Sequence, residues 1–241
     1  MSERIRSVLF AVVMCLIISL LLTAASTGLQ RYQQINMRLD KQKNILESVG
    51  LIEEGKDYPA EAIQRQYREH ILEVWADPAG RIIEKPVAGE ADLPIYLYTA
   101  DNSILSYIVP INSRGLWGPI MGYLAIKNDG ATIAGFTVFK HSETPGLGGE
   151  IESEWFQENF VGKKIVNRKG EFVSIRIAKG KTPANIPGEL KLHYVDGISG
   201  ATLTGNYLTS GIEQVLENYE PVSVRFRKHR IRNLPVDSVG G

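Results

Sequence analysis

The sequence predicts an α+β protein in which one transmembrane helix precedes a domain built on an antiparallel sheet. An uncharged, almost wholly aliphatic run near the N-terminus predicts the transmembrane helix. Short segments rich in β-branched and aromatic residues follow one another through the middle of the chain, with turn residues between them. Helical spacing of apolar residues flanks these segments, and strands in a run with helices at the edges are typical of the α+β class.

Length and composition favour a single sizeable domain with accessory segments. The chain has 241 residues, 44% of them hydrophobic and 22% charged, which is neither disordered nor fibrous. Its 27 basic and 27 acidic residues cancel, so no global field would recruit nucleic acid or anionic lipid. The only cysteine, Cys15, lies in the apolar run, which excludes intrachain disulfides, zinc thiolates and cysteine-ligated iron–sulfur clusters. Redox chemistry in this chain would therefore need a cofactor.

Residues 1–30 are predicted to contain a transmembrane anchor. No residue between Arg6 and Arg31 is charged, and at about 1.5 Å per residue a helix over this run crosses a hydrocarbon core of about 30 Å. A cleaved signal peptide is the alternative, because Ala24-Ala25-Ser26 resembles a cleavage site. The run, however, exceeds the roughly 7–15 apolar residues of such peptides. More basic residues follow the run than precede it, and this count alone favours a cytoplasmic domain.

Residues 31–50 are predicted to continue the membrane helix as an amphipathic stalk. Apolar residues recur there at three- and four-residue spacing, as on one face of a helix: Tyr32, Ile35, Leu39, Leu46 and Val49. Such a stripe needs a partner surface. The chain's own domain and another protein of a complex are equally good candidates for that surface.

Residues 51–222 are predicted to form the α+β domain. Strand-like runs are LPIYLYT, SILSYIVPI, IMGYLAIK, TIAGFTVFK and EFVSIRIAK. Turn signals at 100–102 and 128–130 separate some of them, and Asn128-Asp129-Gly130 is typical of a hairpin. Helices are expected in IQRQYREHILEVW, in SEWFQENF and along an apolar stripe at 208–219.

Residues 223–241 are predicted to be a basic C-terminal tail. The basic residues that define it are Arg225, Arg227, Lys228, Arg230 and Arg232. Such a run is usually a solvated surface, and contact with lipid or an acidic neighbour is the alternative.

A glycine-rich loop, SETPGLGGE, follows the strand-like run TIAGFTVFK. It lacks the third glycine of a dinucleotide fingerprint, because Ile151 stands at that position, and no βαβ unit follows. No GxxxxGK[ST] phosphate loop occurs in the chain either. The bare backbone of this loop, with Leu147 as an apolar contact, suits the close approach of a planar ring system. An ordinary tight turn is the alternative.

A second loop, DGISGATLTGN, combines hydroxyl side chains with glycines where a helix is predicted to begin. Exposed N–H groups at Gly197 and Gly200 and the positive end of the helix dipole would stabilise a phosphate by about 0.3–2 kcal/mol. A phosphate held there would lie within reach of the Thr202 hydroxyl. N-capping, which contributes about 1 kcal/mol, is the alternative role, and one of Ser199, Thr202 and Thr204 is expected to act as the cap.

The sequence gives no support for hydrolytic chemistry or a metal site. GISGA is not the GxSxG elbow of a hydrolase, and nothing places the nearest histidine, His193, against Ser199. His193 is expected at the surface or as a supporting residue beside the loop. The 4 histidines are scattered, and no HxxxH spacing indicates a metal.

Several motifs together resemble those of the membrane-anchored, FMN-binding C subunit of the Na⁺-translocating NADH:quinone reductase. They are the N-terminal anchor, LDKQKNIL after it, GLWGPIMGYLAI, ETPGLGGE and DGISGATLT, so the resemblance covers most of the chain. The pairing of SGAT with ETPGLGGE is its most specific feature. The chain departs from the family around residues 51–92, which look short, and in the basic tail. The G subunit of the related Rnf ferredoxin:NAD⁺ complex shares SGAT and TPGLG, but the GGE ending, the stalk and GLWG favour the quinone reductase.

The resemblance implies FMN bound covalently through a phosphoester to the last threonine of SGAT, which is Thr202. Residues expected to bind the rest of the cofactor are Ser199, Gly200, Ala201, Glu143, Thr144, Gly146, Leu147 and Trp117. A separate flavin transferase would recognise Asp196 and Gly197 together with SGAT, using FAD as donor with Mg²⁺. Such a tether leaves the isoalloxazine ring unaltered, so the protein would tune the ring through contacts alone.

The resemblance also implies a one-electron relay within a membrane complex. FMN would take electrons from one redox centre and pass them to another, while sodium crosses through other subunits. No complete activity is expected from this chain alone. The main domain would lie on the periplasmic side of a bacterial inner membrane, behind a single-pass anchor with a cytoplasmic N-terminus, against the count of flanking charges. The alternative from another class is a non-catalytic membrane-tethered module that binds a phosphorylated ligand reversibly.

Overall fold

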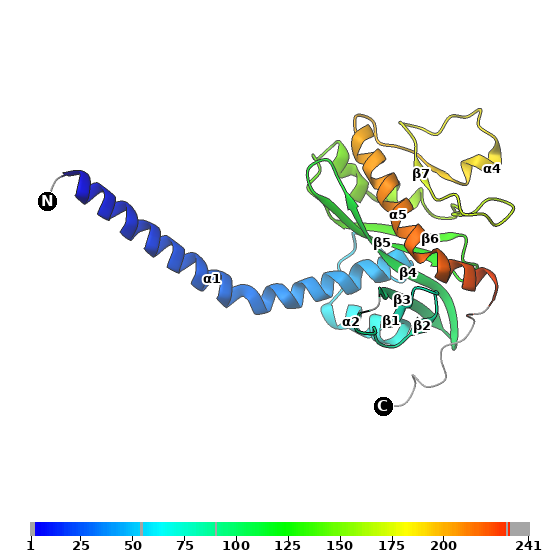
Figure 1. The fold of residues 1–241 in the computed structure, drawn as a ribbon, viewed down its shortest axis with the longest axis horizontal. Coiled ribbons are helices and arrows are strands. Elements are labelled where there is room, and N and C mark those ends of the chain that lie inside the picture. The colour runs from blue at the N-terminus through cyan, green and yellow to red at the C-terminus, as the bar shows by residue number, and fades with distance from the viewer. Residues whose placement is uncertain (1–2, 54, 90, 230, 232–241) are drawn as a thin grey trace. The chain divides into compact units, whose positions relative to one another are not determined.

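A computed structural model gives the fold of residues 3–53, 55–89, 91–229 and 231 (Figure 1). The chain divides into two compact units, Met1–Lys41 and Gln42–Gly241. In chain order the elements are α1 Glu3–Ser48, α2 Ala60–His70, β1 Ile71–Ala76, β2 Ile82–Ile83, β3 Leu93–Ala100, β4 Ser103–Arg114, β5 Pro119–Lys127, β6 Ile133–Lys140, η1 Gly148–Glu152, α3 Glu154–Glu158, β7 Arg176–Ile177, α4 Gly188–Lys191, β8 Tyr194–Val195 and α5 Thr202–Arg227.

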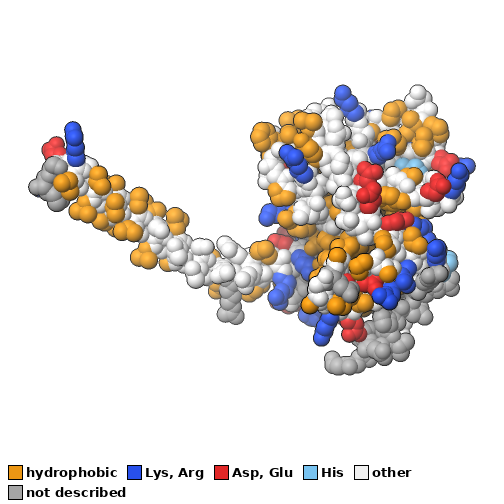
Figure 2. Space-filling model, viewed as in Figure 1, with side chains coloured by type: hydrophobic (Ala, Val, Ile, Leu, Met, Phe, Trp, Pro, Cys, Tyr) orange, Lys and Arg blue, Asp and Glu red, His pale blue; other side chains and the backbone are white. Residues whose placement is uncertain are grey.

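The first unit consists of the N-terminal part of helix α1. Its segment Glu3–Gln30 has 28 residues and a mean hydropathy of 2.9, so it is long and apolar enough to cross a membrane. Exposed hydrophobic side chains are dense on this helix from Ile5 to Leu22 (Figure 2). The predicted N-terminal apolar helix of membrane-spanning length is therefore present.

The last turns of α1 belong to the second unit. Ile45, Leu46 and Ser48 are buried there, and the Thr137 hydroxyl of β6 donates a hydrogen bond to the Asn44 carbonyl oxygen at 3.3 Å. The compact domain thus begins at Gln42 rather than at residue 51, because the end of the predicted stalk packs on the chain's own domain.

The second unit is built on a six-stranded antiparallel sheet with the strand order β2-β1-β3-β4-β5-β6. Strands β3 to β6 coincide with the first four predicted strand-like runs, from LPIYLYT to TIAGFTVFK. The turn between β3 and β4 has Asp101 and Asn102 at φ 48° and 59°, values that these residue types tolerate in tight hairpins. The α+β class and the antiparallel sheet are as predicted.

Two predictions about the elements were wrong. We expected one helix through IQRQYREHILEVW, but α2 ends at His70 and Ile71–Ala76 is strand β1, which pairs with β3 along its whole length. The β-branched and aromatic residues of ILEVW suit a strand, and this pairing decides their conformation. Within EFVSIRIAK only Arg176–Ile177 forms a strand, β7, because Ser174 has a φ of 59° that interrupts extended backbone.

Helices cover both faces of the sheet. Helix α5 packs along β4, and its buried apolar side chains join Val74 in the main core (Figure 1). Helix α2 packs on β1 and β3, where the Tyr67 hydroxyl donates to Glu73 Oε1 at 2.6 Å. Since Glu73 and Val74 are neighbours in a strand, their side chains point to opposite faces.

Helix α5 continues past Pro221 to Arg227, whereas we expected the ordered domain to end at residue 222. The basic residues of this last turn are not simply solvated. Arg225 Nε donates to the Ala79 carbonyl oxygen at 2.9 Å, and Arg227 Nη1 donates to the Gly130 carbonyl oxygen at 2.9 Å. These bonds join the helix end to two turns of the domain. Lys228 is exposed just after the helix, and the remaining two basic residues expected in the tail, Arg230 and Arg232, lie outside the described residues.

Candidate functional site

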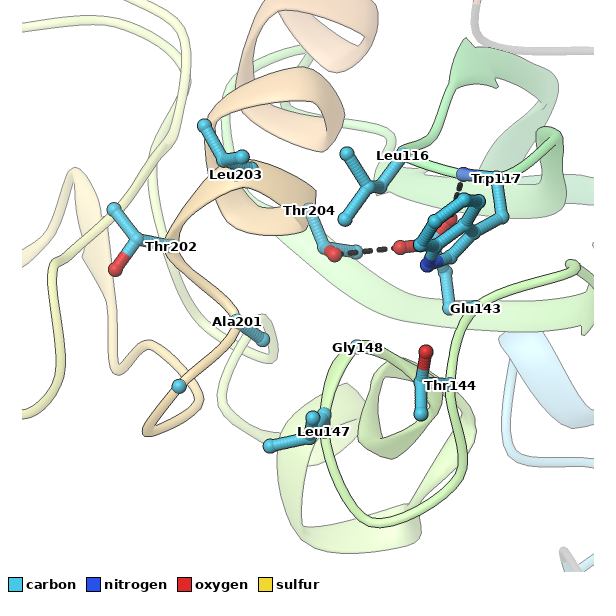
Figure 3. A pocket seen from close by; sticks show the side chains of 11 residues that line it. Leu116, Trp117, Glu143, Thr144, Leu147, Gly148, Ala201, Thr202, Leu203 and Thr204 are labelled. Atoms are coloured by element: carbon cyan, nitrogen blue, oxygen red, sulfur yellow. Dashed lines mark hydrogen bonds between the residues drawn. The ribbon is translucent and has the colours of Figure 1, made fainter.

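A pocket of about 190 Å³ opens where three segments distant in the sequence meet (Figure 3). The segments are the β4–β5 turn, the glycine-rich loop after β6 and the start of helix α5. The lining residues are Leu116, Trp117, Glu143, Thr144, Leu147, Gly148, Gly200, Ala201, Thr202, Leu203 and Thr204. The fold thus brings the motifs GLWG, ETPGLGGE and SGATLT to one place.

The β4–β5 turn contributes two exposed apolar side chains. Leu116 and Trp117 are 42% and 69% exposed. The Gly115 N–H donates to the Gly118 carbonyl oxygen at 2.8 Å and closes the turn beneath them. Large exposed apolar side chains beside a pocket are typical of a surface that contacts a ligand or partner.

The glycine-rich loop is a tight turn whose wall-forming residues are Glu143, Thr144, Leu147 and Gly148. The Thr144 carbonyl oxygen accepts the N–H groups of Leu147 at 3.1 Å and Gly149 at 2.9 Å. Leu147 is 44% exposed and presents its side chain at the pocket. Gly146, which we expected near the cofactor, is exposed, has a φ of 72° and does not line the pocket. The positive φ that the turn requires at this position explains why residue 146 is a glycine.

Helix α5 begins at the pocket without a side-chain cap. Ala201 is the N-cap residue, and no side chain caps the helix, so the expected capping by Ser199, Thr202 or Thr204 was wrong. The first intrahelical bond of this helix runs from the Gly205 N–H to the Ala201 carbonyl oxygen at 3.0 Å. The N–H groups of residues 202–204 therefore have no intrahelical acceptor. Thr202 is half-buried and lines the pocket, whereas Ser199 is exposed and does not.

The expectation that Gly197 offers a free N–H group was also wrong. Its N–H donates to the Gly180 carbonyl oxygen at 2.7 Å, and a Cβ at this position would lie 1.8 Å from the Ala178 carbonyl oxygen. Asp196 accepts the Thr182 N–H at 2.8 Å. Hydrogen bonding by Thr182 lowers the pKa of the Asp196 carboxyl. Both residues fix the loop before the helix, and neither lines the pocket.

Glu143 joins the three segments. It is only 5% exposed. Its Oε1 accepts the backbone N–H of Trp117 at 3.1 Å, and its Oε2 accepts the hydroxyl hydrogen of Thr204 at 2.6 Å (Figure 3). The third hydroxyl of the SGATLT segment thus has a definite partner.

Four pocket residues were not among the predicted cofactor-binding residues: Leu116, Gly148, Leu203 and Thr204. Of these, Thr204 was considered as a helix cap and Gly148 as part of the glycine-rich loop. Each stands beside a motif residue that we did select, so reading whole motifs would have found them. The surface position expected as one alternative for His193 was wrong, and His193 does not line the pocket. Its side chain is 7% exposed, and its Nδ1 lies 2.6 Å from the Lys164 carbonyl oxygen.

The class of protein follows from this site and from a family comparison. Residues 115–217 match the FMN-binding domain family, and this range begins at the β4–β5 turn and includes all the lining residues of the pocket. The chain therefore carries an FMN-binding domain.

Comparison with whole proteins is more specific. The chain is 36% identical over 231 residues to the C subunit of the Na⁺-translocating NADH-quinone reductase from Yersinia pestis, covering 83% of this chain and 84% of that one. It is 33% identical over 234 residues to the C subunit from Vibrio vulnificus, covering 85% and 88% of the two chains. The crystal structure of the C subunit from Parabacteroides distasonis superimposes with a TM-score of 0.68 at 29% identity, covering 81% and 96%. The chain belongs to the C-subunit family of the Na⁺-translocating NADH-quinone reductase.

Proposed function

We propose that this chain is an electron-transfer subunit whose FMN is joined by a phosphoester to Thr202. The observation that carries the proposal is the position of Thr202, which is the first residue of α5 and lines the pocket. A bound flavin supplies the ability to accept and release electrons one at a time. The chain's own residues would hold that flavin and decide what can approach it.

The residues present suit a flavin phosphate at the helix start. The N–H groups of residues 202–204 lack intrahelical acceptors and lie at the positive end of the α5 dipole, an arrangement that stabilises an anion. Figure 3 shows Thr202 on the opposite side of the helix start from Thr204. A phosphate on Thr202 would therefore lie at the rim of the pocket, with Gly200 and Ala201 beside it.

The remaining walls suit a planar, largely apolar ring. Trp117, Leu147 and Leu203 are exposed apolar side chains that would cover parts of such a ring and exclude water from them. The pocket volume of about 190 Å³ is below the roughly 300–1,000 Å³ of sites that enclose a ligand of this size. The ring would thus remain partly uncovered, and a partner redox centre could come close to it.

The family resemblance supports the wider setting of this proposal. The segment Glu3–Gln30 would anchor the chain in the bacterial inner membrane as a single pass, with the main domain on the periplasmic side. Other subunits of the reductase would donate and accept the electrons and carry sodium. A flavin transferase, with FAD and Mg²⁺, would attach the FMN after recognising the DGISGAT loop. In this loop the Asp196 carboxylate accepts the Thr182 N–H, and the Gly197 N–H donates to the Gly180 carbonyl oxygen.

A denaturing gel tests the tether. The wild-type chain, produced together with the transferase, should give a band with flavin fluorescence after denaturation. Thr202→Ala should remove that fluorescence, whereas Ser199→Ala, a hydroxyl removed from the same loop but outside the pocket, should keep it. A wild-type band without flavin would contradict the proposal. Flavin that is present before denaturation and lost on the gel would instead support a reversible binding module.

A further inference from the structure

We infer that Glu143 is a positioning residue whose carboxylate holds the three walls of the pocket together. The assignment to the flavin rests on the proposed function, but the positioning itself is a property of the protein without cofactor. Two hydrogen bonds of the carboxylate, two glycines that approach it closely and the contacts of the Glu143 backbone support this role.

The two oxygens of the carboxylate hold two different segments. Oε1 accepts the N–H of Trp117 from the β4–β5 turn, and Oε2 accepts the hydroxyl hydrogen of Thr204 from the first turn of α5. Both donors are neutral, and no ion pair to Glu143 occurs within the part of the chain that the structure describes. The geometry of these bonds, rather than a countercharge, therefore fixes the carboxylate.

Two glycines make room for this carboxylate. A Cβ on Gly115 would lie 2.5 Å from Glu143 Oε1, and a Cβ on Gly148 would lie 2.8 Å from Glu143 Oε2 and 2.6 Å from Thr204 Oγ1. Any larger residue at either position would push the backbone away from the carboxylate. Gly115 of GLWG and Gly148 of ETPGLGGE are thus explained by one side chain that both segments approach.

The Glu143 backbone is held in turn by His141. The Glu143 N–H donates to His141 Nδ1 at 3.1 Å, and His141 Nε2 lies 2.9 Å from Glu152 Oε2. The imidazole therefore acts as an acceptor at Nδ1 and as a donor at Nε2. This chain of contacts connects the Glu143 backbone to η1, so the carboxylate is presented from a fixed base.

Two substitutions of Glu143 separate positioning from side-chain volume. Glu143→Gln can keep both bonds, because its carbonyl oxygen can accept the Trp117 N–H while its NH₂ group donates to the Thr204 hydroxyl oxygen. Glu143→Ala can keep neither. Glu158→Ala, an exposed glutamate of α3 outside the pocket, is the matched control.

The first measurement uses the full chain in detergent with Thr202→Ala, so that no flavin is attached by the proposed tether. Hydrogen–deuterium exchange is followed in peptides that contain Trp117. Glu143→Ala should speed exchange of the Trp117 amide about tenfold, the loss expected for one hydrogen bond, whereas Glu143→Gln and Glu158→Ala should leave it near the parent rate. If Glu143→Ala does not fold, Thr204→Val, which removes one of the two bonds, should speed the same exchange severalfold. Unchanged exchange in both Glu143→Ala and Thr204→Val would overturn the inference.

The second measurement uses the flavin-loaded chain. The visible circular dichroism of the flavin depends on fixed surroundings of its ring. Glu143→Ala should therefore lose most of this signal, and the separate variant Glu143→Gln should keep it. Equal circular dichroism in the wild type and in Glu143→Ala would contradict the positioning of the ring by Glu143. A wild type without attached flavin would overturn the proposed function instead, and the exchange measurement would still decide the role of Glu143.

Discussion

Three hydroxyl side chains near the start of helix α5 have three different surroundings, although the sequence spaces them almost evenly. Ser199 is exposed outside the pocket, Thr202 is half-buried on its rim, and Thr204 is buried and bonded to Glu143. The roles that we propose for them therefore differ: flavin attachment for Thr202 and positioning for Thr204, whereas Ser199 does not line the pocket. In the same loop, Gly197 is explained by backbone packing alone, because a Cβ at this position would collide with the Ala178 carbonyl oxygen.

The charge of Glu143 should affect the reduction potential of the flavin. A buried carboxylate on the pocket wall disfavours the addition of an electron nearby. Glu143→Gln should therefore raise the potential by tens of millivolts, on the order of the ~59 mV that corresponds to a tenfold change for one electron. A potentiometric titration of the loaded chain measures this change, with Glu158→Gln as the control. A lowered potential in Glu143→Gln would contradict the electrostatic argument.

Gly197 should be intolerant of any side chain. A Cβ there would lie 1.8 Å from the Ala178 carbonyl oxygen, so the loop or its neighbour must move. Gly197→Ala should lower the free energy of unfolding by roughly 1–3 kcal/mol, as overpacking does. Urea denaturation followed by tryptophan fluorescence measures the loss. Gly188→Ala, where no atom lies within 4 Å of the added Cβ, should be close to neutral or slightly stabilising.

At the scale of elements, the strands and helices that depend on local sequence patterns could be predicted from the sequence. Strands β3 to β6 have long β-branched and aromatic runs between recognisable turns, so their existence and their positions along the chain were predictable. Strand β1 was not, because ILEVW continues a helical pattern and only pairing with β3 decides its conformation. In the site, Thr202 was predictable from its motif. The bonds of Glu143 were not, because they join residues 26 and 61 positions apart.

The turn between β1 and β2 should give the domain a pH-dependent stability. Asp77 is buried, and its carboxylate accepts the N–H groups of Ala79 and Arg81 and pairs with the Arg81 guanidinium. Although desolvation by burial opposes ionisation, the hydrogen bonds and charge of Arg81 hold the pKa of Asp77 below its usual value of 3.8. A lowered folded-state pKa means that this stabilisation is complete above the unfolded-state pKa and is lost as pH falls through the folded-state pKa.

Asp77→Asn tests this effect. At pH 7 the variant should be less stable than the wild type by about 1.5–3 kcal/mol, the range for hydrogen bonds to a charged group. The difference should shrink as the pH falls below about 4, where the carboxyl of the unfolded wild type begins to take up a proton, and it should be lost as the pH falls through the lower pKa of the folded state. Urea unfolding at several pH values measures it, with Asp101→Asn in an exposed turn as the control. A difference that stays constant from pH 7 to pH 3 would refute the linkage.

At the scale of the whole molecule, an apolar N-terminal segment of membrane-spanning length and an FMN-binding domain occur in one chain. The pocket lies where the β4–β5 turn, the glycine-rich loop and the start of α5 meet. The exposed side chains of Trp117 and Leu203 form part of its lining. The proposed tether would suit an electron relay at such a pocket, because the cofactor would stay attached while its ring remained accessible to partners. The chain's membership of the C-subunit family agrees with this arrangement.

Peptide mass spectrometry tests the central claim most directly. The full chain, produced with the flavin transferase, is digested, and the peptide that contains Thr202 is fragmented to locate any added mass. The proposal predicts the mass of FMN, less one water, on the Thr202 side chain and an unmodified peptide from Thr202→Ala. An unmodified wild-type peptide, or flavin located on Ser199 or Thr204, would contradict it.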